Sequence, residues 1–353
     1  MKTIHINASR EYDVVLGTGL LAQCGERMAE TLPGAEKIAL VTDEAVGALY
    51  AGRVRSSLEA AGFPVSEFVF PPGEASKTLE TWQALLGFLA GQRLTRSDAI
   101  AALGGGVTGD LAGFAAACYQ RGIRYVQLPT TLLAAADSSV GGKTAVDHPA
   151  GKNLAGAFWQ PSLVLCDTDA LQTLPPVEYR RGCAELIKYG VLDGEELFSA
   201  LENTFPDAVG EDVLARCVEI KKSIVAADEL DTGARRLLNL GHTAAHAAET
   251  LSGFTLAHGD AVAMGLVSIA RACAARGLCP RADAERIEAL CRQCGLPVEL
   301  PYPASELCVA ALADKKRRGA ELPLVVIEGV GKCSVRSIPA DAYAGWLSAG
   351  GAR

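Results

Sequence analysis

The chain has 353 residues, of which 49% are hydrophobic and 21% are charged, and its formal net charge is -8. These values are typical of a globular protein with a sizeable core and exclude a disordered or fibrous chain. The acidic excess argues against a broad basic surface for nucleic acid or anionic membranes, and no apolar run reaches the roughly 18 residues of a membrane span. The length favours two domains.

In the first half of the chain, short β-branched runs alternate with helical stretches. Helices are predicted over segments such as residues 44–61 and 76–92, where apolar residues recur at three- and four-residue spacing. The alternation predicts an α/β fold with a mostly parallel, doubly wound sheet. Strands are predicted at residues 12–16, 37–42, 65–70, 99–103, 125–129 and 163–167.

After about residue 170 the pattern changes to long stretches rich in Ala, Glu, Leu and Arg, which predict helices over residues 176–313. Two apolar runs, residues 322–327 and 332–338, flank a Glu-Gly-Val-Gly turn and predict a hairpin. We therefore expect an α/β domain over residues 1–170 and a mostly α-helical domain over residues 171–353.

The eleven cysteines are an odd number and are scattered along the chain, which is typical of a reducing compartment and not of a disulfide scaffold. The N-terminal residues lack the apolar core of a signal peptide, so a cytoplasmic location is expected. Cys291 and Cys294 form one CxxC, but they lie in an amphipathic helical pattern without a second pair nearby. They are interpreted as ordinary helix residues.

A glycine loop over residues 104–110 joins a predicted strand to a predicted helix. Backbone amides at such a junction, together with the helix N-terminus, favour a pyrophosphate, although the glycine spacing alone is a weak signal. Asp43 and Glu44, at the end of an earlier strand, could bind a ribose hydroxyl or could cap the next helix. A second polar loop over residues 71–77 follows another strand.

Residues 121–153 have unusual polar density for connecting segments, and we interpret them as loops. Arg121 and two lysines beside glycines, Lys143 and Lys152, can donate hydrogen bonds to oxygen while the backbone stays close to a ligand. The pattern predicts an anionic, phosphate-bearing ligand. Surface lysines in ordinary turns are the alternative.

Three of the five histidines, His242, His246 and His258, fall within seventeen residues. His242 and His246 are four apart and share one face of a predicted helix. With Glu185 they can build a nitrogen and oxygen site for a zinc-like metal, while a structural role is the alternative. The pattern does not say which histidine stands outside the site.

Five segments, taken together, resemble the 3-dehydroquinate synthase family in order and spacing. They are GGGVTGDLAGFAAACYQRGI, PTTLLAAADSSVGGKTAVDHPAGKN, GCAELIKYG, VAADELDTGARRLLNLGHTAAH and HGD. The resemblance covers essentially the whole chain. It implies a Rossmann-like NAD-binding domain, a helical domain that binds the substrate and one divalent metal ion, zinc or cobalt, and a homodimer.

The resemblance also implies roles for individual positions. Its metal ligands are Glu185, His242 and His258, which leaves His246 on the substrate side. Its substrate contacts are Arg121, Asp137, Lys143, Lys152, Asn153, Lys188, Lys221, Arg235, Asn239, His246 and Lys316. Its NAD contacts are Asp43, Pro72, Gly73, Glu74, Ala75, Ser76, Lys77, Gly106, Val107, Thr108, Gly109, Asp110, Thr130, Thr131, Ala170, Leu171, Gln172 and Thr173, together with Lys143 and Lys152.

The implied reaction converts 3-deoxy-D-arabino-heptulosonate 7-phosphate to 3-dehydroquinate and phosphate, a step of the shikimate pathway toward chorismate and the aromatic amino acids. NAD oxidises the C5 alcohol transiently, phosphate is eliminated, the hydride returns, and an intramolecular aldol reaction closes the ring. The metal polarises the C5 oxygen, and Arg235 matches the substrate carboxylate. Such an enzyme is a carbon–oxygen lyase.

Three features depart from the family pattern. Asp147 stands where Asn is common, Asp260 stands where Glu is usual, and small alanines occupy residues 134–136. They affect expectations about local packing and substrate affinity but not about the reaction class.

The sequence leaves three alternative functions. A sister sugar-phosphate cyclase would act on a substrate without a carboxylate, and Arg235, Asn239 and His246 argue against it. An NAD- and metal-dependent polyol dehydrogenase would release NADH, and the lysine-rich segment favours a phosphate substrate instead. A catalytically silent NAD-binding protein would not need metal ligands, so the intact set of Glu185, His242 and His258 argues against it.

Overall fold

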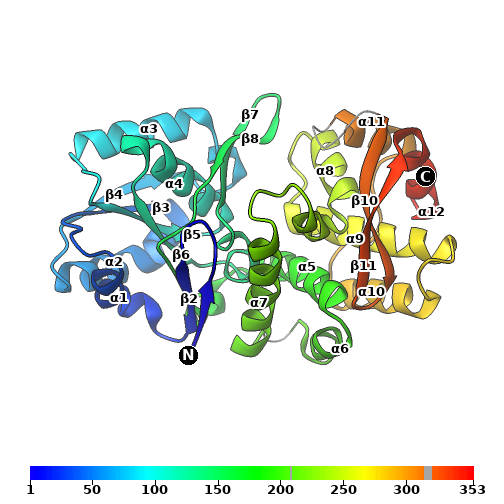
Figure 1. Ribbon diagram of the computed structural model, residues 1–353, viewed down its shortest axis with the longest axis horizontal. Helices are drawn as coiled ribbons and strands as arrows, with labels where there is room; N and C mark the ends of the chain where they lie inside the picture. The colour runs from blue at the N-terminus through cyan, green and yellow to red at the C-terminus, as the bar shows by residue number, and fades with distance from the viewer. Residues whose placement is uncertain (207–208, 314–319) are drawn as a thin grey trace. The chain divides into compact units, whose positions relative to one another are not determined.

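The computed structural model describes residues 1–206, 209–313 and 320–353 (Figure 1). The chain divides into two compact units, each described by itself below. Unit 1 comprises Met1–Pro175 and Lys221–Glu229, and unit 2 comprises Pro176–Ile220 and Leu230–Arg353. Among the described residues, no helix combines the length and the apolar character needed to cross a bilayer.

Unit 1 is built on a seven-stranded sheet with the strand order β1-β2-β9-β6-β5-β3-β4. All neighbouring strands are parallel except β1, which pairs antiparallel with β2 at the edge. The predicted mostly parallel sheet is confirmed, and each predicted strand end lies within one residue of the observed one. The strands are β1 (Lys2–Ile6), β2 (Tyr12–Gly17), β3 (Ile38–Asp43), β4 (Val65–Phe70), β5 (Ala99–Gly104), β6 (Arg124–Pro129) and β9 (Leu163–Asp167).

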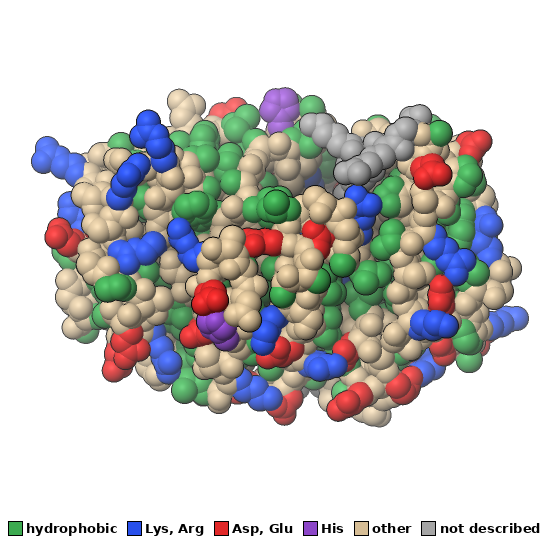
Figure 2. All heavy atoms as spheres, viewed as in Figure 1, with side chains coloured by type: hydrophobic (Ala, Val, Ile, Leu, Met, Phe, Trp, Pro, Cys, Tyr) green, Lys and Arg blue, Asp and Glu red, His purple; other side chains and the backbone are tan. Residues whose placement is uncertain are grey.

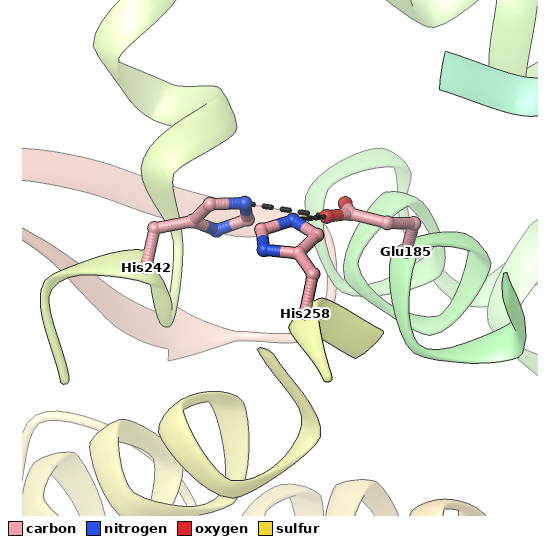
Figure 3. Close-up of side chains that lie close together, drawn as sticks. All are labelled: Glu185, His242 and His258. Carbon is pink, nitrogen blue, oxygen red and sulfur yellow. Dashed lines mark ion pairs between the residues drawn. The ribbon is translucent and has the colours of Figure 1, made fainter. Parts of the chain in front are cut away.

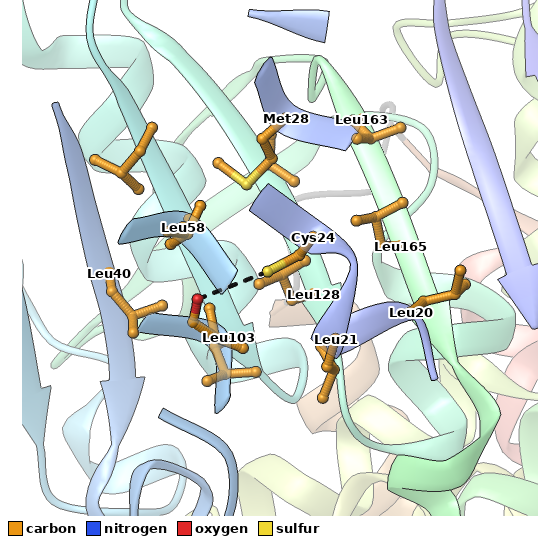
Figure 4. Packing of buried hydrophobic residues seen from close by; sticks show 14 of the residues in the cluster. Leu20, Leu21, Cys24, Met28, Leu40, Leu58, Leu103, Leu128, Leu163 and Leu165 are labelled. Carbon is orange, nitrogen blue, oxygen red and sulfur yellow. Dashed lines mark hydrogen bonds between the residues drawn. The ribbon is translucent and has the colours of Figure 1, made fainter. Parts of the chain in front are cut away.

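Helices cover both faces of this sheet, which explains why its central strands are continuous apolar runs. Successive side chains of a strand point to opposite faces, so Leu40 of β3 enters one core cluster and its neighbour Val41 enters the other. The first cluster lies under α1 (Cys24–Thr31) and α2 (Glu44–Ala60), where Cys24 Sγ contacts the Val54 carbonyl at 3.8 Å (Figure 4). The second lies under α3 (Leu79–Gly91) and α4 (Gly106–Cys118).

The segment interpreted as loops contains an antiparallel hairpin of two strands, β7 (Lys143–His148) and β8 (Gly151–Phe158). The prediction of loops was wrong here, because paired backbone groups hold these residues extended despite their glycines and lysines. Thr144 packs so closely on α4 that a Cβ at Gly113 would overlap its side chain. Short helical turns complete unit 1: η1 (Leu20–Ala22), η2 (Glu74–Ser76), η3 (Tyr119–Arg121), η4 (Ala134–Ser138) and η5 (Thr168–Thr173).

Unit 2 is mostly helical, as predicted, and carries the expected hairpin of β10 (Glu321–Gly329) and β11 (Lys332–Pro339). Acidic and basic side chains are interspersed on the face of the molecule that Figure 2 shows. The helices are α5 (Pro176–Asp193), α6 (Glu195–Thr204), α7 (Glu211–Ala227), α8 (His242–Leu251), α9 (His258–Ala275), α10 (Arg281–Gln293), α11 (Ala304–Ala313) and α12 (Tyr343–Ala349), with short turns at η6 (Ala234–Asn239) and η7 (Ala340–Ala342); the last seven residues of α7 belong to unit 1.

Candidate metal centre and active-site residues

Glycines at backbone contacts let three helices of unit 2 approach one another. A Cβ at Gly265 of α9 would overlap the carbonyl oxygen of Gly241, the residue before α8. A Cβ at Gly259 would likewise overlap the carbonyl oxygen of Arg181 in α5. Only residues without a side chain allow contacts this close, so α9 can pack directly on both α5 and the start of α8.

Each of these helices contributes one side chain to a compact group (Figure 3). Glu185 lies within α5, while His242 and His258 are the first residues of α8 and α9. Both histidine Nε2 atoms point at Glu185 Oε1, at 3.2 Å from His242 and 3.3 Å from His258. Bonds of about 2.1 Å in a tetrahedral zinc site separate ligand atoms by about 3.4 Å, which agrees with both measured distances. The three donor atoms lie within 4.8 Å of one another, so they could hold one ion.

The tautomer of His242 is set by a backbone contact. Its Nδ1 lies 3.0 Å from the carbonyl oxygen of Leu240. A carbonyl can only accept, so Nδ1 carries the proton and Nε2 keeps its lone pair. His242 therefore presents a metal-binding nitrogen toward Glu185.

The local charges favour an anionic Glu185 beside a neutral His242. Burial opposes ionisation of Glu185, but the Lys188 ammonium 2.5 Å from Oε2 and the two imidazoles outweigh it and hold the pKa of Glu185 well below its usual value. Burial lowers the pKa of His242 below 6.5 despite the neighbouring carboxylate. Burial also opposes protonation of His258, but hydrogen bonds to Glu185 and Glu249 raise its pKa to about 10. A metal ion must displace that proton to bind.

The other predicted site residues of unit 2 that the structure describes are close in sequence to Glu185 or to His242. The ring of His246 is centred 5.4 Å from that of His242 and 6.2 Å from that of His258. Arg235, with 1% of its surface exposed, and Asn239 lie on η6, just before α8. Lys188 is buried beside Glu185, whereas Lys316 lies outside the described residues.

In unit 1, Lys77 joins three predicted segments through its buried ammonium. Its Nζ lies 2.6 Å from Asn153 Oδ1, 2.7 Å from Asp110 Oδ2 and 3.6 Å from Glu74 Oε1. Burial opposes the charged form of Lys77, but Asp110 and Glu74 outweigh it and raise its pKa. The charged lysine thus ties the loop at residues 71–77 to the start of α4 and to the β7–β8 hairpin. Sequence reasoning did not predict these contacts.

One of the residues that depart from the family pattern, Asp147, lies in the same hairpin. Asp147 accepts a hydrogen bond of 2.8 Å from the backbone N–H of Asn153, whose φ of 54° is left-handed. Lys152, next to Asn153, lies 3.6 Å from Glu74. Lys143 begins β7 and pairs with Phe158, at the end of the hairpin away from its turn. In unit 2, Asp260 accepts from Arg181 at 3.0 Å and links α9 to α5.

Two further predicted substrate residues, Lys221 and Asp137, form an ion pair within unit 1. Lys221 Nζ lies 2.8 Å from both the carboxylate Oδ1 and the carbonyl oxygen of Asp137. Asp137 lies in η4, which is preceded by Thr130 and Thr131, and Thr131 accepts a hydrogen bond from the start of this turn. Arg121 ends η3 with a left-handed φ of 64° and is exposed.

The remaining positions predicted for NAD lie at strand ends and helix starts of unit 1. Asp43 caps α2 by accepting the N–H groups of Ala45 and Val46 at 3.0 Å each, so the capping interpretation is confirmed. The glycine loop starts α4 at Gly106, as predicted for a strand-to-helix junction. Residues Pro72, Gly73, Glu74, Ala75 and Ser76 form the loop around η2, Val107, Thr108, Gly109 and Asp110 form the first turn of α4, and Ala170, Leu171, Gln172 and Thr173 lie in η5.

The fold matches solved structures of sugar-phosphate cyclases. Over 98% of this chain and 99% of the other, it is similar to 2-deoxy-scyllo-inosose synthase complexed with carbaglucose-6-phosphate, NAD+ and Co2+, with a TM-score of 0.84 and 25% identity. The 2-epi-5-epi-valiolone synthase from Streptomyces hygroscopicus subsp. jinggangensis 5008, with NAD+ and Zn2+ bound, matches over 96% of both chains with a TM-score of 0.87 and 27% identity. The fold is therefore that of a sugar-phosphate cyclase.

Sequence comparisons give the family within that class. Residues 67–181 match the 3-dehydroquinate synthase N-terminal family and residues 182–317 match the 3-dehydroquinate synthase C-terminal family. The 3-dehydroquinate synthase of Caulobacter vibrioides (strain NA1000 / CB15N) is 48% identical over 340 residues, 92% of each chain, and that of Streptococcus suis (strain 05ZYH33) is 44% identical over 339 residues, 94% of this chain and 95% of the other. The chain belongs to the 3-dehydroquinate synthase family, which confirms the resemblance drawn from the five segments.

Proposed function

We propose that the protein converts 3-deoxy-D-arabino-heptulosonate 7-phosphate to 3-dehydroquinate and phosphate, with NAD and one divalent metal ion, zinc or cobalt, as cofactors. The observation that carries the proposal is the convergence of two histidine Nε2 atoms on Glu185 in a chain of this family. The enzyme class is a carbon–oxygen lyase. Related cyclases that bind NAD+ with Co2+ or Zn2+ support the cofactors.

Glu185, His242 and His258 are the proposed metal ligands. Two imidazole nitrogens and one carboxylate oxygen suit zinc and cobalt and leave a coordination position for substrate. A bound metal supplies polarisation of the substrate oxygen at the oxidised carbon. Lys188 supports the site by holding Glu185 ionised, because its ammonium lies 2.5 Å from the second carboxylate oxygen.

Unit 1 is the proposed NAD-binding domain. Its glycine loop places the N-terminus of α4, with unsatisfied backbone N–H groups, at the end of β5, where a pyrophosphate is favoured. Bound NAD supplies reversible hydride removal, so it is regenerated within each turnover. Asp43 remains our candidate for a ribose hydroxyl, since a capping carboxylate has further lone pairs to accept with.

The substrate phosphate is assigned to cationic and amide groups of unit 1. Lys143, Lys152 and Asn153 come from one hairpin, and Arg121 is a further candidate. Within β8, Asn153 has a left-handed φ of 54°, and its side-chain oxygen accepts a hydrogen bond of 2.6 Å from Lys77, which positions its amide group. Preorganised donors cost less to order when an anion binds.

Arg235 is the proposed partner of the substrate carboxylate, because a guanidinium donates two parallel hydrogen bonds to it. His246 and Asn239 are assigned to ring hydroxyls, and Asp137, Lys221 and Lys316 complete the proposed substrate contacts. We also propose a homodimer on the family resemblance. A cytoplasmic location is supported by the eleven cysteines, none of which is joined in a disulfide.

The carboxylate assignment separates this function from that of a sister cyclase. Two charged hydrogen bonds contribute about 1.5–3 kcal/mol each, so Arg235→Leu should lower kcat/KM for the carboxylated substrate by at least about 100-fold. It should have little effect on an analogue in which a hydroxymethyl group replaces the carboxylate. Arg236→Leu, in the same turn, is the matched control. Wild-type preference for the analogue, or equal losses for both substrates, would contradict the assignment.

A further inference from the structure

Glu249 is a buried carboxylate that the proposed metal set does not use. It lies on α8, two turns beyond His242, and its side chain is only 2% exposed. Its Oε1 lies 3.4 Å from Nδ1 of His258. Burying a carboxylate is costly unless hydrogen bonds stabilise its charge, so this contact requires a physical explanation.

The contact involves the ring nitrogen of His258 that does not face Glu185. Nε2 lies 3.3 Å from Glu185 Oε1, on the side where the metal is proposed, while Nδ1 faces Glu249 on the other side. When Nε2 binds a cation, the remaining ring proton is on Nδ1. A carboxylate at that nitrogen accepts this proton and makes Nε2 more electron-rich.

The Nδ1 atoms of the two histidines face different kinds of hydrogen-bond acceptor. Nδ1 of His242 faces a neutral carbonyl, and its side chain is 10% exposed, so packing also restrains the ring. The side chain of His258 is 36% exposed and has less packing to hold it. The contact of His258 is the longer of the two, at 3.4 Å against 3.0 Å, but its acceptor is a carboxylate, which in its charged form accepts a stronger hydrogen bond than a carbonyl at equal distance.

We propose that Glu249 is a positioning residue that accepts the Nδ1 proton of His258, fixes the rotamer and tautomer of this ring, and thereby raises the affinity of the site for its metal ion. The inference rests on the proposed ligand set of Glu185, His242 and His258. It assigns Glu249 no contact with substrate or cofactor.

The same carboxylate belongs to a second group of possible ligands, with His246 and His258, whose donor atoms lie within 4.8 Å of one another. A second cation there would require both nitrogens of His258 to bind metal as a bridging imidazolate. That arrangement needs removal of both ring protons and places two dications on one ring. The positioning role requires neither.

The test compares Glu249→Leu, which removes the acceptor, with Glu249→Gln, which keeps a neutral acceptor of nearly the same shape. Zinc affinity is measured by competition with a chromogenic chelator, and the visible absorption of the Co2+-substituted protein reports ligand geometry. We expect Glu249→Leu to weaken zinc binding by about 10- to 100-fold and to shift the Co2+ bands, with Glu249→Gln intermediate in both. NAD binding should not change.

Thr250→Ala is the matched control, because Thr250 is the next residue, is exposed and bonds only its own helix carbonyl at His246 among the contacts described. It should keep wild-type zinc affinity. Wild-type affinity and an unchanged Co2+ spectrum in Glu249→Gln and Glu249→Leu would overturn the inference. So would two zinc ions per wild-type chain that fall to one in Glu249→Gln, since Glu249 would then be a ligand itself.

His258→Ala distinguishes failure of this inference from failure of the proposed function. Loss of zinc in His258→Ala with full retention in the Glu249 variants would overturn only the positioning role. Full retention in His258→Ala would overturn the ligand set and with it the inference. If Glu249→Leu does not fold, Glu249→Gln still decides, because it removes the charge without changing the shape.

Discussion

The ion pair between Lys188 and Glu185 has a large expected effect on stability because both side chains are buried. Their exposed fractions are 2% and 1%, and the Nζ to Oε2 distance is 2.5 Å. Removing one partner of a buried pair leaves an uncompensated charge and costs about 3–5 kcal/mol, whereas an exposed pair contributes about 0–1 kcal/mol. Protonated His258 still lies 3.3 Å from Glu185 and compensates part of its charge. We therefore predict that Lys188→Met destabilises metal-free unit 2 by more than about 1 kcal/mol and by at most about 3–5 kcal/mol.

The loss of stability in Lys188→Met should depend on pH and on bound metal. Without Lys188, Glu185 can lower the cost of its buried charge by binding a proton, so the loss should be smaller at pH 5.5 than at pH 8. A cation bound at the same carboxylate also compensates its charge, so zinc should recover part of the loss. In the double variant Lys188→Met/Glu185→Gln, neither charge remains, and stability should return toward that of the wild type.

The assay is urea unfolding in chelator, followed by fluorescence of Trp346, which lies in unit 2 with the pair. Replacing Trp82 and Trp159 of unit 1 with Phe isolates this signal. The control is Arg281→Met, which breaks an exposed pair with Glu285 of 88% and 65% exposure and should cost less than about 1 kcal/mol. Equal losses in Lys188→Met and Arg281→Met would refute the reasoning.

Two further predictions concern pH and helix packing. The pKa of His258 is raised from 6.5 to about 10 in the metal-free fold, so its contribution to stability is fully present below pH 6.5 and is lost as pH rises through about 10. Thermal unfolding in chelator should show this loss of stability with rising pH in the wild type and not in His258→Gln. Parallel pH dependences of the two proteins would contradict it. Gly265→Ala should cost about 1–3 kcal/mol and weaken zinc binding, because its methyl group would overlap the Gly241 carbonyl oxygen and separate α8 from α9. The control is Gly87→Ala at an exposed position of α3 with open space around it, which should stabilise by about 0.5–1 kcal/mol; similar effects at both glycines would count against the packing argument.

The strands of the parallel sheet could be predicted because helices bury both of their faces, which requires continuous apolar runs bounded by turn residues. The hairpin of β7 and β8 could not, because its stability comes from cross-strand pairing and from packing of Thr144 on α4, and neither leaves an apolar run in the sequence. The edge strand β1 was also missed, because its alternation of exposed and buried residues, with Ile4 and Ile6 buried, extends over only five residues.

The candidate site was only partly accessible from the sequence. Histidine spacing indicated a metal, but His242 and His246 share a helix face, and spacing could not say which ring meets Glu185. That depends on the backbone contacts of Gly241 and Gly259, which bring the starts of α8 and α9 to α5. The contact of Lys77 with Asn153, 76 positions apart in sequence, likewise arises only from the tertiary fold.

The most direct test of the central claim is phosphate release from 3-deoxy-D-arabino-heptulosonate 7-phosphate by the purified protein with NAD and zinc or cobalt, while absorbance follows NADH. We predict release of one phosphate per carbocyclic product formed, without accumulation of NADH. Accumulation of NADH without phosphate release would contradict the account and indicate a dehydrogenase. Turnover confined to a heptulose or hexose phosphate without a carboxylate would contradict it in favour of a sister cyclase.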